Sequence, residues 1–313
     1  MIRKIPFTDH DNWLELRKQA LGGSDAAAVL GLSKWSSPLA VYADKLGLVP
    51  PREDSEAMRQ GRDLEEYVAQ RFTEATGLKV RRENHILVND AYPFMHANID
   101  RRIVGQEAGL ECKTTSVYNR TDFDGGDVPP EYYCQCQHYM AVTGYHKWYL
   151  AVLILNKGFY VFCIERNWDD IASLIATEEA FWNDHVLAQV PPDPNDNDDD
   201  TLAALYPKDE GGFAPLYSMS ATLKALVAKK EAAKALDAEI SALENQVKLA
   251  LGEASEGSDD TYTVTWKTRI SNRLDTKALK AEMPEVYEQY AKESSSRTFL
   301  LKEIKKESKE RIA

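Results

Sequence analysis

The amino-acid sequence predicts an α/β protein, in which helices flank a central mixed sheet and a C-terminal appendage of helices and strands follows. Three observations predict this class. Apolar residues recur at helical spacing in the first 76 residues, and short apolar or alternating runs of strand length follow up to residue 164. A long amphipathic pattern then begins only after an acidic, proline-containing segment. This order of elements indicates one large core and a smaller unit.

The N-terminal part of the core is expected to be helical. The clearest signal is the set Leu64, Val68 and Phe72, which lie at i, i+4 and i+8 on one helix face, with Glu65 at the edge of that face. The Gly-Gly-Ser-Asp run at residues 22–25 is typical of a helix start. The predicted helices cover residues 8–20, 26–30, 36–46 and 61–76.

The sheet is expected to follow these helices. Residues 99–104 and 110–113 alternate apolar and polar side chains, as half-buried strands do, and the glycines between them predict the turn of a hairpin. The other predicted strands cover residues 80–88, 148–155 and 158–164, and two further helices cover residues 131–144 and 169–190.

A change of composition after residue 190 predicts the domain boundaries. Prolines and a run of aspartates at residues 191–200 are typical of a solvated linker. We therefore expect a core over residues 1–190, an acidic linker or loop over 191–215 and an α+β appendage over 216–313. Within the appendage, the pattern predicts a helix over 220–251 whose apolar stripe is a packing seam, a strand over 261–267, a helix over 276–290 and a partner strand over 297–301.

Composition narrows the class of function. The 313-residue chain has a formal charge of −12, which excludes a general nucleic-acid coat protein, because such proteins neutralise phosphates with excess lysine and arginine. No apolar run reaches the about 20 residues that a membrane span needs, and the N-terminus lacks the apolar segment of a signal peptide, so a cytoplasmic location without membrane contact is expected. The four cysteines lack zinc-ligand spacing and are expected to be reduced thiols.

The most informative residues are Asp100, Glu111 and Lys113, which fall on the predicted hairpin. Side chains two apart in a strand share a face, so Glu111 and Lys113 point the same way while Cys112 points into the core. Mg²⁺ is held by one or two carboxylates together with a substrate phosphate. A lysine beside a metal-bound water can position that water. The pattern is typical of metal-dependent phosphodiesterases, and its ordinary structural alternative is a solvated hairpin edge.

Six motifs in sequence order extend this pattern. They are Trp13-x-x-x-Arg17, Gly22-Gly23-Ser24-Asp25, Gly61-x-x-x-Glu65, Asp100, Glu111-Cys112-Lys113 and Gln135-x-Gln137. Over residues 10–190 they resemble the lambda exonuclease family, which comprises the YqaJ-type viral recombinases or phage-type alkaline exonucleases. The tail from about residue 216 resembles an extension that many YqaJ-type members carry.

The resemblance implies a restriction-endonuclease-like (PD-(D/E)xK) core and a metal-dependent deoxyribonuclease. Such an enzyme degrades linear double-stranded DNA from its 5′ ends, releases 5′-phosphomononucleotides and leaves 3′ single strands for a single-strand annealing recombinase. The resemblance also implies a ring-shaped homotrimer that encloses the DNA. Because the chain is acidic, we expect the walls of such a channel to be locally basic, through Arg81, Arg82, Arg101, Arg102 and Arg120.

Carried over residue by residue, the resemblance implies a role for each motif. Asp100 and Glu111 would ligate Mg²⁺, with two ions per site and Mn²⁺ as an alternative, and the backbone carbonyl of Cys112 would be a further ligand. Lys113 would act on the nucleophilic water. Glu65 would help to bind the second ion or orient the water.

Three further residues complete the implied site. Gln135 would reach the same cluster, whereas Arg17 and Ser24 would hold the 5′-terminal phosphate. Gln135 and Gln137 lie two apart on a helix, so only one of them can face the site. His96, upstream of Asp100, is expected to be structural rather than a metal ligand.

Ordinary structural interpretations of these side chains stay open. Glu65 could pair on the helix surface with Arg62, and Ser24 could be a simple helix cap. Arg17 could pair with Asp11 or Glu15. The function could likewise be that of a restriction-like or structure-specific endonuclease, or that of a non-catalytic scaffold that binds DNA ends.

Overall fold

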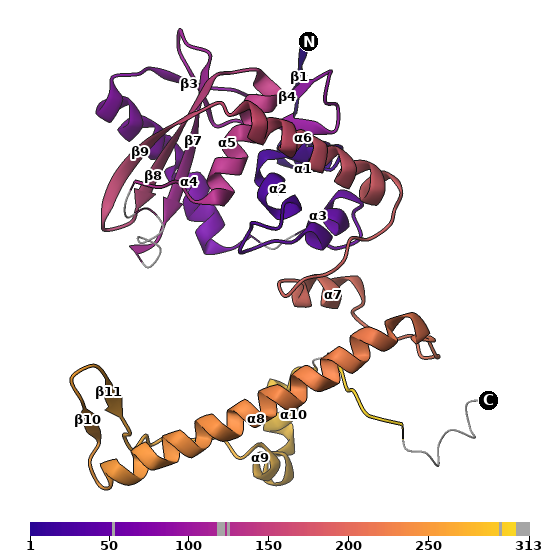
Figure 1. Cartoon of the computed structure of the whole chain (residues 1–313), viewed down its shortest axis with the longest axis vertical. Helices are drawn as coiled ribbons and strands as arrows, with labels where there is room; N and C mark the ends of the chain where they lie inside the picture. The colour runs from indigo at the N-terminus through magenta and orange to yellow at the C-terminus, as the bar shows by residue number, and fades with distance from the viewer. Residues whose placement is uncertain (52–53, 118–122, 124–125, 294–295, 305–313) are drawn as a thin grey trace. The chain divides into compact units, whose positions relative to one another are not determined.

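Contacts divide the chain into two compact units, Met1–Pro207 and Lys208–Ala313. The structure, a computed structural model, describes residues 1–51, 54–117, 123, 126–293 and 296–304 (Figure 1). The first unit extends beyond residue 190 and includes the first part of the segment expected to be a linker. No helix within these ranges is long and apolar enough to cross a membrane.

The N-terminal helices form where the sequence predicts them, with shifted ends. Three of the four starts have polar caps, because the side chains of Asp9, Ser37 and Ser55 accept hydrogen bonds from backbone N–H groups of the first turn. The Ser55 cap explains why the fourth helix starts five residues before the predicted Gly61. The four helices are α1 (His10–Arg17), α2 (Gly23–Val29), α3 (Pro38–Lys45) and α4 (Glu56–Thr76).

The central sheet has five strands in the order β3-β6-β7-β8-β9. Strands β7 and β8 are parallel and the other pairs are antiparallel, which confirms the predicted mixed sheet. The hairpin is also confirmed, because Arg101 on β6 pairs with Leu110 on β7. The strands are β3 (Val80–Arg82), β6 (Arg101–Ile103), β7 (Ala108–Thr115), β8 (Lys147–Ile154) and β9 (Gly158–Glu165).

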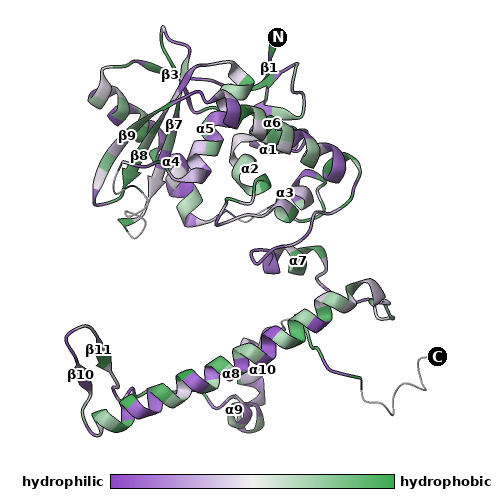
Figure 2. Ribbon diagram, in the orientation of Figure 1, coloured by the Kyte–Doolittle hydropathy of each residue, from purple (hydrophilic) through white to green (hydrophobic). Residues whose placement is uncertain are grey.

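Helices cover both faces of this sheet (Figure 1). Val68, Ala69 and Phe72 of α4 pack with Leu110 and other buried side chains on one face. On the other face lies α5 (Pro130–Thr143), whose buried residues pack with Trp148 and its neighbours on β8. Helices α2 and α6 (Trp168–Phe181) pack in turn against α5. A segment of π-helix, Trp182–Leu187, continues α6. Figure 2 shows many hydrophobic residues along β8 and β9, and five of the eight residues of β8 are buried.

The predicted strand over residues 80–88 is in fact two strands in different sheets. Its second half, β4 (His85–Asn89), belongs to a four-stranded sheet with β1 (Ile2–Pro6), β5 (Met95–Ala97) and β2 (Leu21–Gly22), in the order β1-β4-β5-β2. The division falls at Glu83, whose carboxylate binds Lys4 at 2.8 Å and Arg102 at 3.2 Å. These charged partners hold the break between β3 and β4 in place.

The acidic segment after residue 190 is not solvated throughout. Asp198 is fully buried, and its carboxylate accepts hydrogen bonds from the Ser37 hydroxyl and from the Asn195 N–H at 2.7 Å. Helix α7 (Asp199–Leu205) follows and contacts α3. The expectation of a purely solvated linker is therefore wrong for this part, because Ser37 gives Asp198 a buried partner.

The second unit is built around α8 (Ser220–Leu251), the predicted long helix, which a 3₁₀ turn, Tyr217–Met219, precedes. Figure 2 shows hydrophobic and hydrophilic residues interspersed along α8, and none of its residues is buried. The predicted strand 261–267 is shorter, as β11 (Thr263–Thr265). Its partner is β10 (Glu256–Ser258), so the expectation of a strand over residues 297–301 is wrong, because a local hairpin supplies the partner. The predicted helix over 276–290 is divided at Pro284 into α9 (Thr276–Glu282) and α10 (Pro284–Tyr290), since proline lacks the N–H that would continue α9.

Candidate active site

The hairpin places Asp100, at the entrance to β6, beside β7, which carries Glu111. Asp100 immediately precedes β6, and its Oδ2 accepts a hydrogen bond of 2.7 Å from the backbone N–H of Cys112 on β7. Cys112 packs against the cluster beneath α4, whereas Glu111 faces α5. The predicted alternation along β7 is therefore confirmed.

Glu111 is the centre of a buried polar cluster. The residue is 3% exposed, and its Oε1 lies 2.6 Å from the Lys113 Nζ. The same oxygen accepts a hydrogen bond of 2.8 Å from the Gln135 Nε2, which also donates to the Tyr139 hydroxyl at 2.8 Å. The Lys113 ammonium lies 5.4 Å from the centre of the Tyr132 ring. Helix α5 and strand β7 thus bring Glu111, Lys113 and Gln135 together.

The electrostatics of this cluster follow from burial and like charge. Burial, followed by the nearby carboxylates of Glu111 and Glu65, raises the pKa of Asp100 well above its ordinary value. Burial alone would lower the pKa of Lys113, but the adjacent Glu111 outweighs it and the net shift is upward. Lys113 is therefore charged at neutral pH. Two acidic side chains, Asp100 and Glu111, therefore share one buried site.

The residues present fit a hard divalent cation. The second oxygen of Glu111, Oε2, is buried and has no hydrogen-bond partner in the described part of the chain, so it is free to act as a ligand. Mg²⁺ commonly takes one or two carboxylates and completes its shell with water and substrate oxygen. Among the described residues, no group of three or more His, Cys, Asp or Glu side chains is arranged around a common point. Asp100 and Glu111 are the two carboxylates here that could hold such an ion.

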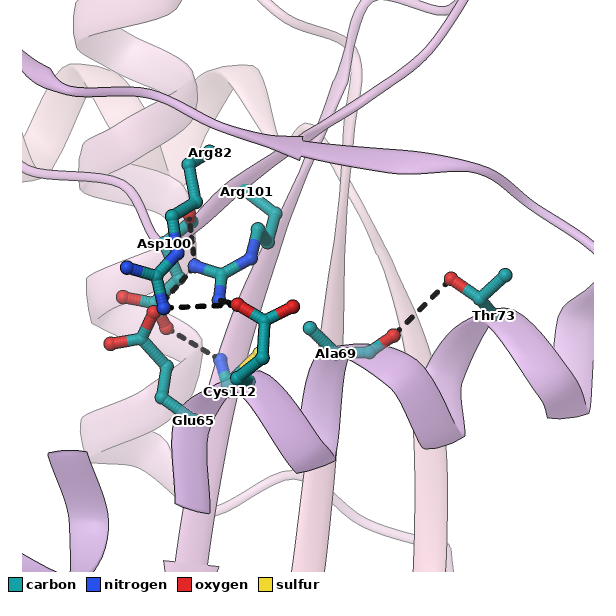
Figure 3. A network of polar contacts seen from close by, with 8 residues as sticks. Glu65, Ala69, Thr73, Arg82, Asp100, Arg101 and Cys112 are labelled. Atoms are coloured by element: carbon teal, nitrogen blue, oxygen red, sulfur yellow. Dashed lines mark hydrogen bonds and ion pairs between the residues drawn. The ribbon is translucent and has the colours of Figure 1, made fainter. Parts of the chain in front are cut away.

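Glu65 lies next to this pair but is engaged elsewhere. Figure 3 shows its carboxylate directed at the guanidinium of Arg101, to which it is hydrogen-bonded, and Arg101 is only 2% exposed. Arg101 also binds Glu66 at 3.1 Å, and Arg82 binds the same Glu66 oxygen at 3.0 Å. The expected alternative partner, Arg62, instead binds Asp54. Glu65 therefore faces the site, as an Arg101-bound carboxylate.

The predicted phosphate-binding residues also come together. The Arg17 guanidinium donates a hydrogen bond of 3.2 Å to the Ser24 hydroxyl and lies 3.8 Å from Asp25. Asp25 is buried and is held by the Lys45 ammonium at 2.6 Å, which outweighs the effect of burial and, with Arg17, lowers the pKa of Asp25. Arg17 does not pair with Glu15, which binds Lys18 at 2.8 Å.

Two histidines lie behind this second cluster and have structural roles. His138 is fully buried between Glu178 Oε1 and the backbone carbonyl of His96, each 2.9 Å from one of its ring nitrogens. The carboxylate of Glu178 raises the pKa of His138 against the opposing effect of burial. Burial lowers the pKa of His96 to about 3, so it is neutral. Within the described part of the chain, no hydrogen bond or ion pair joins His96 to Asp100 or Glu111.

Three other expectations can be compared with the structure. Of the two glutamines, only Gln135 reaches Glu111, whereas Gln137 donates to the Glu165 carbonyl at 2.9 Å, as predicted from their spacing. The cysteines are free thiols, as expected. The expected basic walls are largely neutralised, because Arg82, Arg101 and Arg102 are paired with glutamates, and Arg120 lies outside the described residues.

Sequence reasoning missed two contacts of the site. The ion pairs of Arg101 with Glu65 and Glu66 depend on how α4 packs over β6, and no sequence periodicity indicates that packing. The Tyr139 contact to Gln135 could have been found from the i, i+4 spacing on one helix.

The fold is similar to that of proteins whose structures are known. A structure of an alkaline exonuclease from Laribacter hongkongensis is 21% identical with a TM-score of 0.50, over 58% of this chain and 94% of that one. The same enzyme in complex with dAMP is 22% identical with a TM-score of 0.51, at the same coverage. The first unit thus has the restriction-endonuclease-like α/β fold of the alkaline exonucleases.

Sequence comparison then defines the family. A family model described as the YqaJ-like viral recombinase domain matches residues 12–146. The uncharacterised protein YqaJ of Bacillus subtilis (strain 168) is 40% identical over 97% of this chain and 98% of its own length. The chain belongs to the YqaJ-like viral recombinase family.

Proposed function

We propose that this protein is a Mg²⁺-dependent 5′→3′ exonuclease of linear double-stranded DNA, which releases 5′-phosphomononucleotides. The observation that carries the proposal is the buried cluster in which Lys113 and Gln135 both bind Oε1 of Glu111, while Asp100 lies immediately before the adjoining strand. The fold shared with alkaline exonucleases supports a nuclease. The use of Mg²⁺, the 5′→3′ direction of digestion and the release of mononucleotides are what we propose beyond this.

The roles of the residues follow from their positions. Asp100 and Glu111 would hold Mg²⁺, with the Cys112 carbonyl as a proposed further ligand, and bound Mg²⁺ would polarise the phosphate and lower the pKa of a bound water. Lys113, charged and anchored by Glu111, holds positive charge where the attacked phosphate develops negative charge. Gln135 keeps the Glu111 carboxylate in one orientation.

The choice of the 5′ end rests on the second cluster. Arg17 and Ser24 present a guanidinium and a hydroxyl side by side, which suits a terminal phosphate. Glu65 would assist a second metal ion or the water by exchanging its ion pair with Arg101 for that role. Mn²⁺ would be accepted by the same oxygen ligands.

The biological setting is part of the same proposal. The name of the family, viral recombinase, supports an enzyme that prepares 3′ single strands for recombination by strand annealing. We place it in the cytoplasm, with a single-strand annealing recombinase as its partner and a homotrimeric ring as its assembly. The arginines near the site are paired with glutamates and so provide little free positive charge. We therefore propose that enclosure by the ring, rather than a basic surface, retains the DNA.

The direct test compares linear and closed circular duplexes of the same sequence, with Mg²⁺ and with EDTA. We expect Mg²⁺-dependent release of nucleotides from the linear DNA and intact circles. Cut circles would instead identify an endonuclease, and binding without any product in Mg²⁺ or Mn²⁺ would identify a scaffold.

Substituting Arg17 by alanine should remove the preference for phosphorylated ends. Because the Arg17 guanidinium would form charge-assisted hydrogen bonds with the terminal phosphate, we expect digestion of 5′-phosphorylated DNA to slow by about 10-fold to 100-fold, and digestion of 5′-hydroxyl DNA to change little. The measurement is the initial rate of nucleotide release from both substrates. Arg71→Ala is a matched control, because Arg71 lies over the Tyr67 and Phe159 rings, as Arg17 lies over Trp13, but bonds neither Ser24 nor Asp25. Equal slowing on both substrates would remove Arg17 from the phosphate site.

A further inference from the structure

Trp13 lies on the boundary between two cavities of the first unit. A cavity of about 200 Å³ is lined by Trp13 together with Glu65 and Asp100. A larger cavity of about 770 Å³ is lined by Trp13 together with Arg17. One indole side chain therefore forms a wall of both the carboxylate pocket and the pocket that contains the arginine.

The indole also makes a specific contact on each side. The Arg17 guanidinium carbon lies 4.9 Å from the centre of the Trp13 ring, which is within the range of a cation–π interaction. On the other side, the indole N–H donates a hydrogen bond of 3.1 Å to the Asn98 Oδ1. Asn98 is two residues before Asp100 in the chain. Trp13 therefore connects the arginine to the segment that carries the carboxylate.

The far ends of this connection are themselves fixed. Arg17 is held from its other side by Ser24, and Asp100 is held by the backbone N–H of Cys112 on β7. The segment before Asn98 is tied into the four-stranded sheet by β5. Trp13 and Asn98 therefore form the contact that joins two clusters, each of which is also held by other partners.

We propose that Trp13 is a positioning residue, which sets the separation between the group that binds the terminal phosphate and the carboxylates that direct cleavage, through its contacts with Arg17 and Asn98. This inference rests on the proposed function. The separation determines which phosphodiester bond lies at the carboxylates, so a correct separation yields mononucleotides. If the separation is less well fixed, the next phosphodiester bond can also reach the carboxylates, and dinucleotides are released as well.

The test uses the full chain and three variants: Trp13→Phe, which keeps an aromatic face beneath Arg17 but lacks the N–H, Asn98→Ala, which removes the acceptor, and the double variant. The substrates are linear duplexes with 5′-phosphate or 5′-hydroxyl ends, and the readouts are the product lengths and the ratio of initial rates on the two ends. We expect each single variant to release dinucleotides and to lose about fivefold to tenfold of the 5′-phosphate preference. The double variant should be no worse than the single ones, because all three lack the same hydrogen bond.

Trp168→Phe is the matched control, because the Arg166 guanidinium lies 4.1 Å from the centre of the exposed Trp168 ring, outside both cavities. It should keep the product lengths and end preference of the original protein. If Trp13→Phe and Asn98→Ala release only mononucleotides with an unchanged end ratio, or lose activity equally on both ends, the inference is wrong. Failure of the proposed function would be visible separately, as an unsubstituted protein that releases no nucleotides or shows no end preference.

Discussion

Replacing Lys113 with methionine should reduce nucleotide release by at least about 100-fold to 1,000-fold, the size of effect that the loss of one preorganised electrostatic group has on catalysis. Methionine keeps the length and volume of the side chain but removes the charge that lies 2.6 Å from Glu111. Without that charge, the developing negative charge on the attacked phosphate loses its stabilisation. Initial rates on linear duplex DNA at saturating Mg²⁺ measure the effect.

Binding of DNA ends should survive the same substitution, because Arg17 and Ser24 belong to a different cluster. A gel-shift assay with EDTA measures it. Lys147→Met is the matched control, since Lys147 is another lysine at a sheet strand beside a tyrosine ring, at 5.8 Å from Tyr149, but is not in contact with Glu111. A Lys113→Met protein within about tenfold of the original rate would exclude Lys113 from the chemistry.

Replacing Gly109 with alanine should be the most damaging single methyl addition to the sheet. A Cβ atom at Gly109 would lie 2.2 Å from two carbons of the Trp148 ring, which is fully buried on the neighbouring strand. Either β7 or the indole must move, so we expect the free energy of unfolding to fall by about 1–3 kcal/mol or more. Because Glu111 and Lys113 follow on the same strand, activity should fall as well. Thermal unfolding followed by circular dichroism measures the first effect.

Gly61→Ala provides the contrasting control. Among the described residues, its Cβ would meet only the Thr114 hydroxyl, at an ordinary 3.7 Å, and Gly61 lies within α4. Alanine should therefore raise the free energy of unfolding by about 0.5–1 kcal/mol. An unchanged melting temperature for Gly109→Ala would contradict the tight packing of β7 against Trp148.

The core of the fold could be predicted because its residues follow simple periods. The spacing of Leu64, Val68 and Phe72 predicts α4, and the alternation from Leu110 to Lys113 predicts both β7 and the side on which Glu111 lies. The ends of elements were less predictable. Strands as short as β2 carry no periodicity, and the separation of β3 from β4 depends on ion pairs of Glu83 that join distant parts of the chain.

The site shows the same division between local and distant information. Glu111 and Lys113 are neighbours on one strand, so their contact follows from the two-residue period. Their partner Gln135 comes from α5, and its place there was expected only from the family resemblance. Two other contacts, between Glu65 and Arg101 and between Trp13 and Asn98, join different elements of the fold. They depend on how these elements pack, which no local sequence pattern indicates.

The most direct test of the account is a time course of digestion with Mg²⁺ on linear duplexes labelled separately at the 5′ and the 3′ end. The account predicts early loss of the 5′ label as a mononucleotide, while the 3′ label stays on a long single strand, and no loss of either label in EDTA. Early release of the 3′ label, or internal fragments that carry the 5′ label, would contradict it.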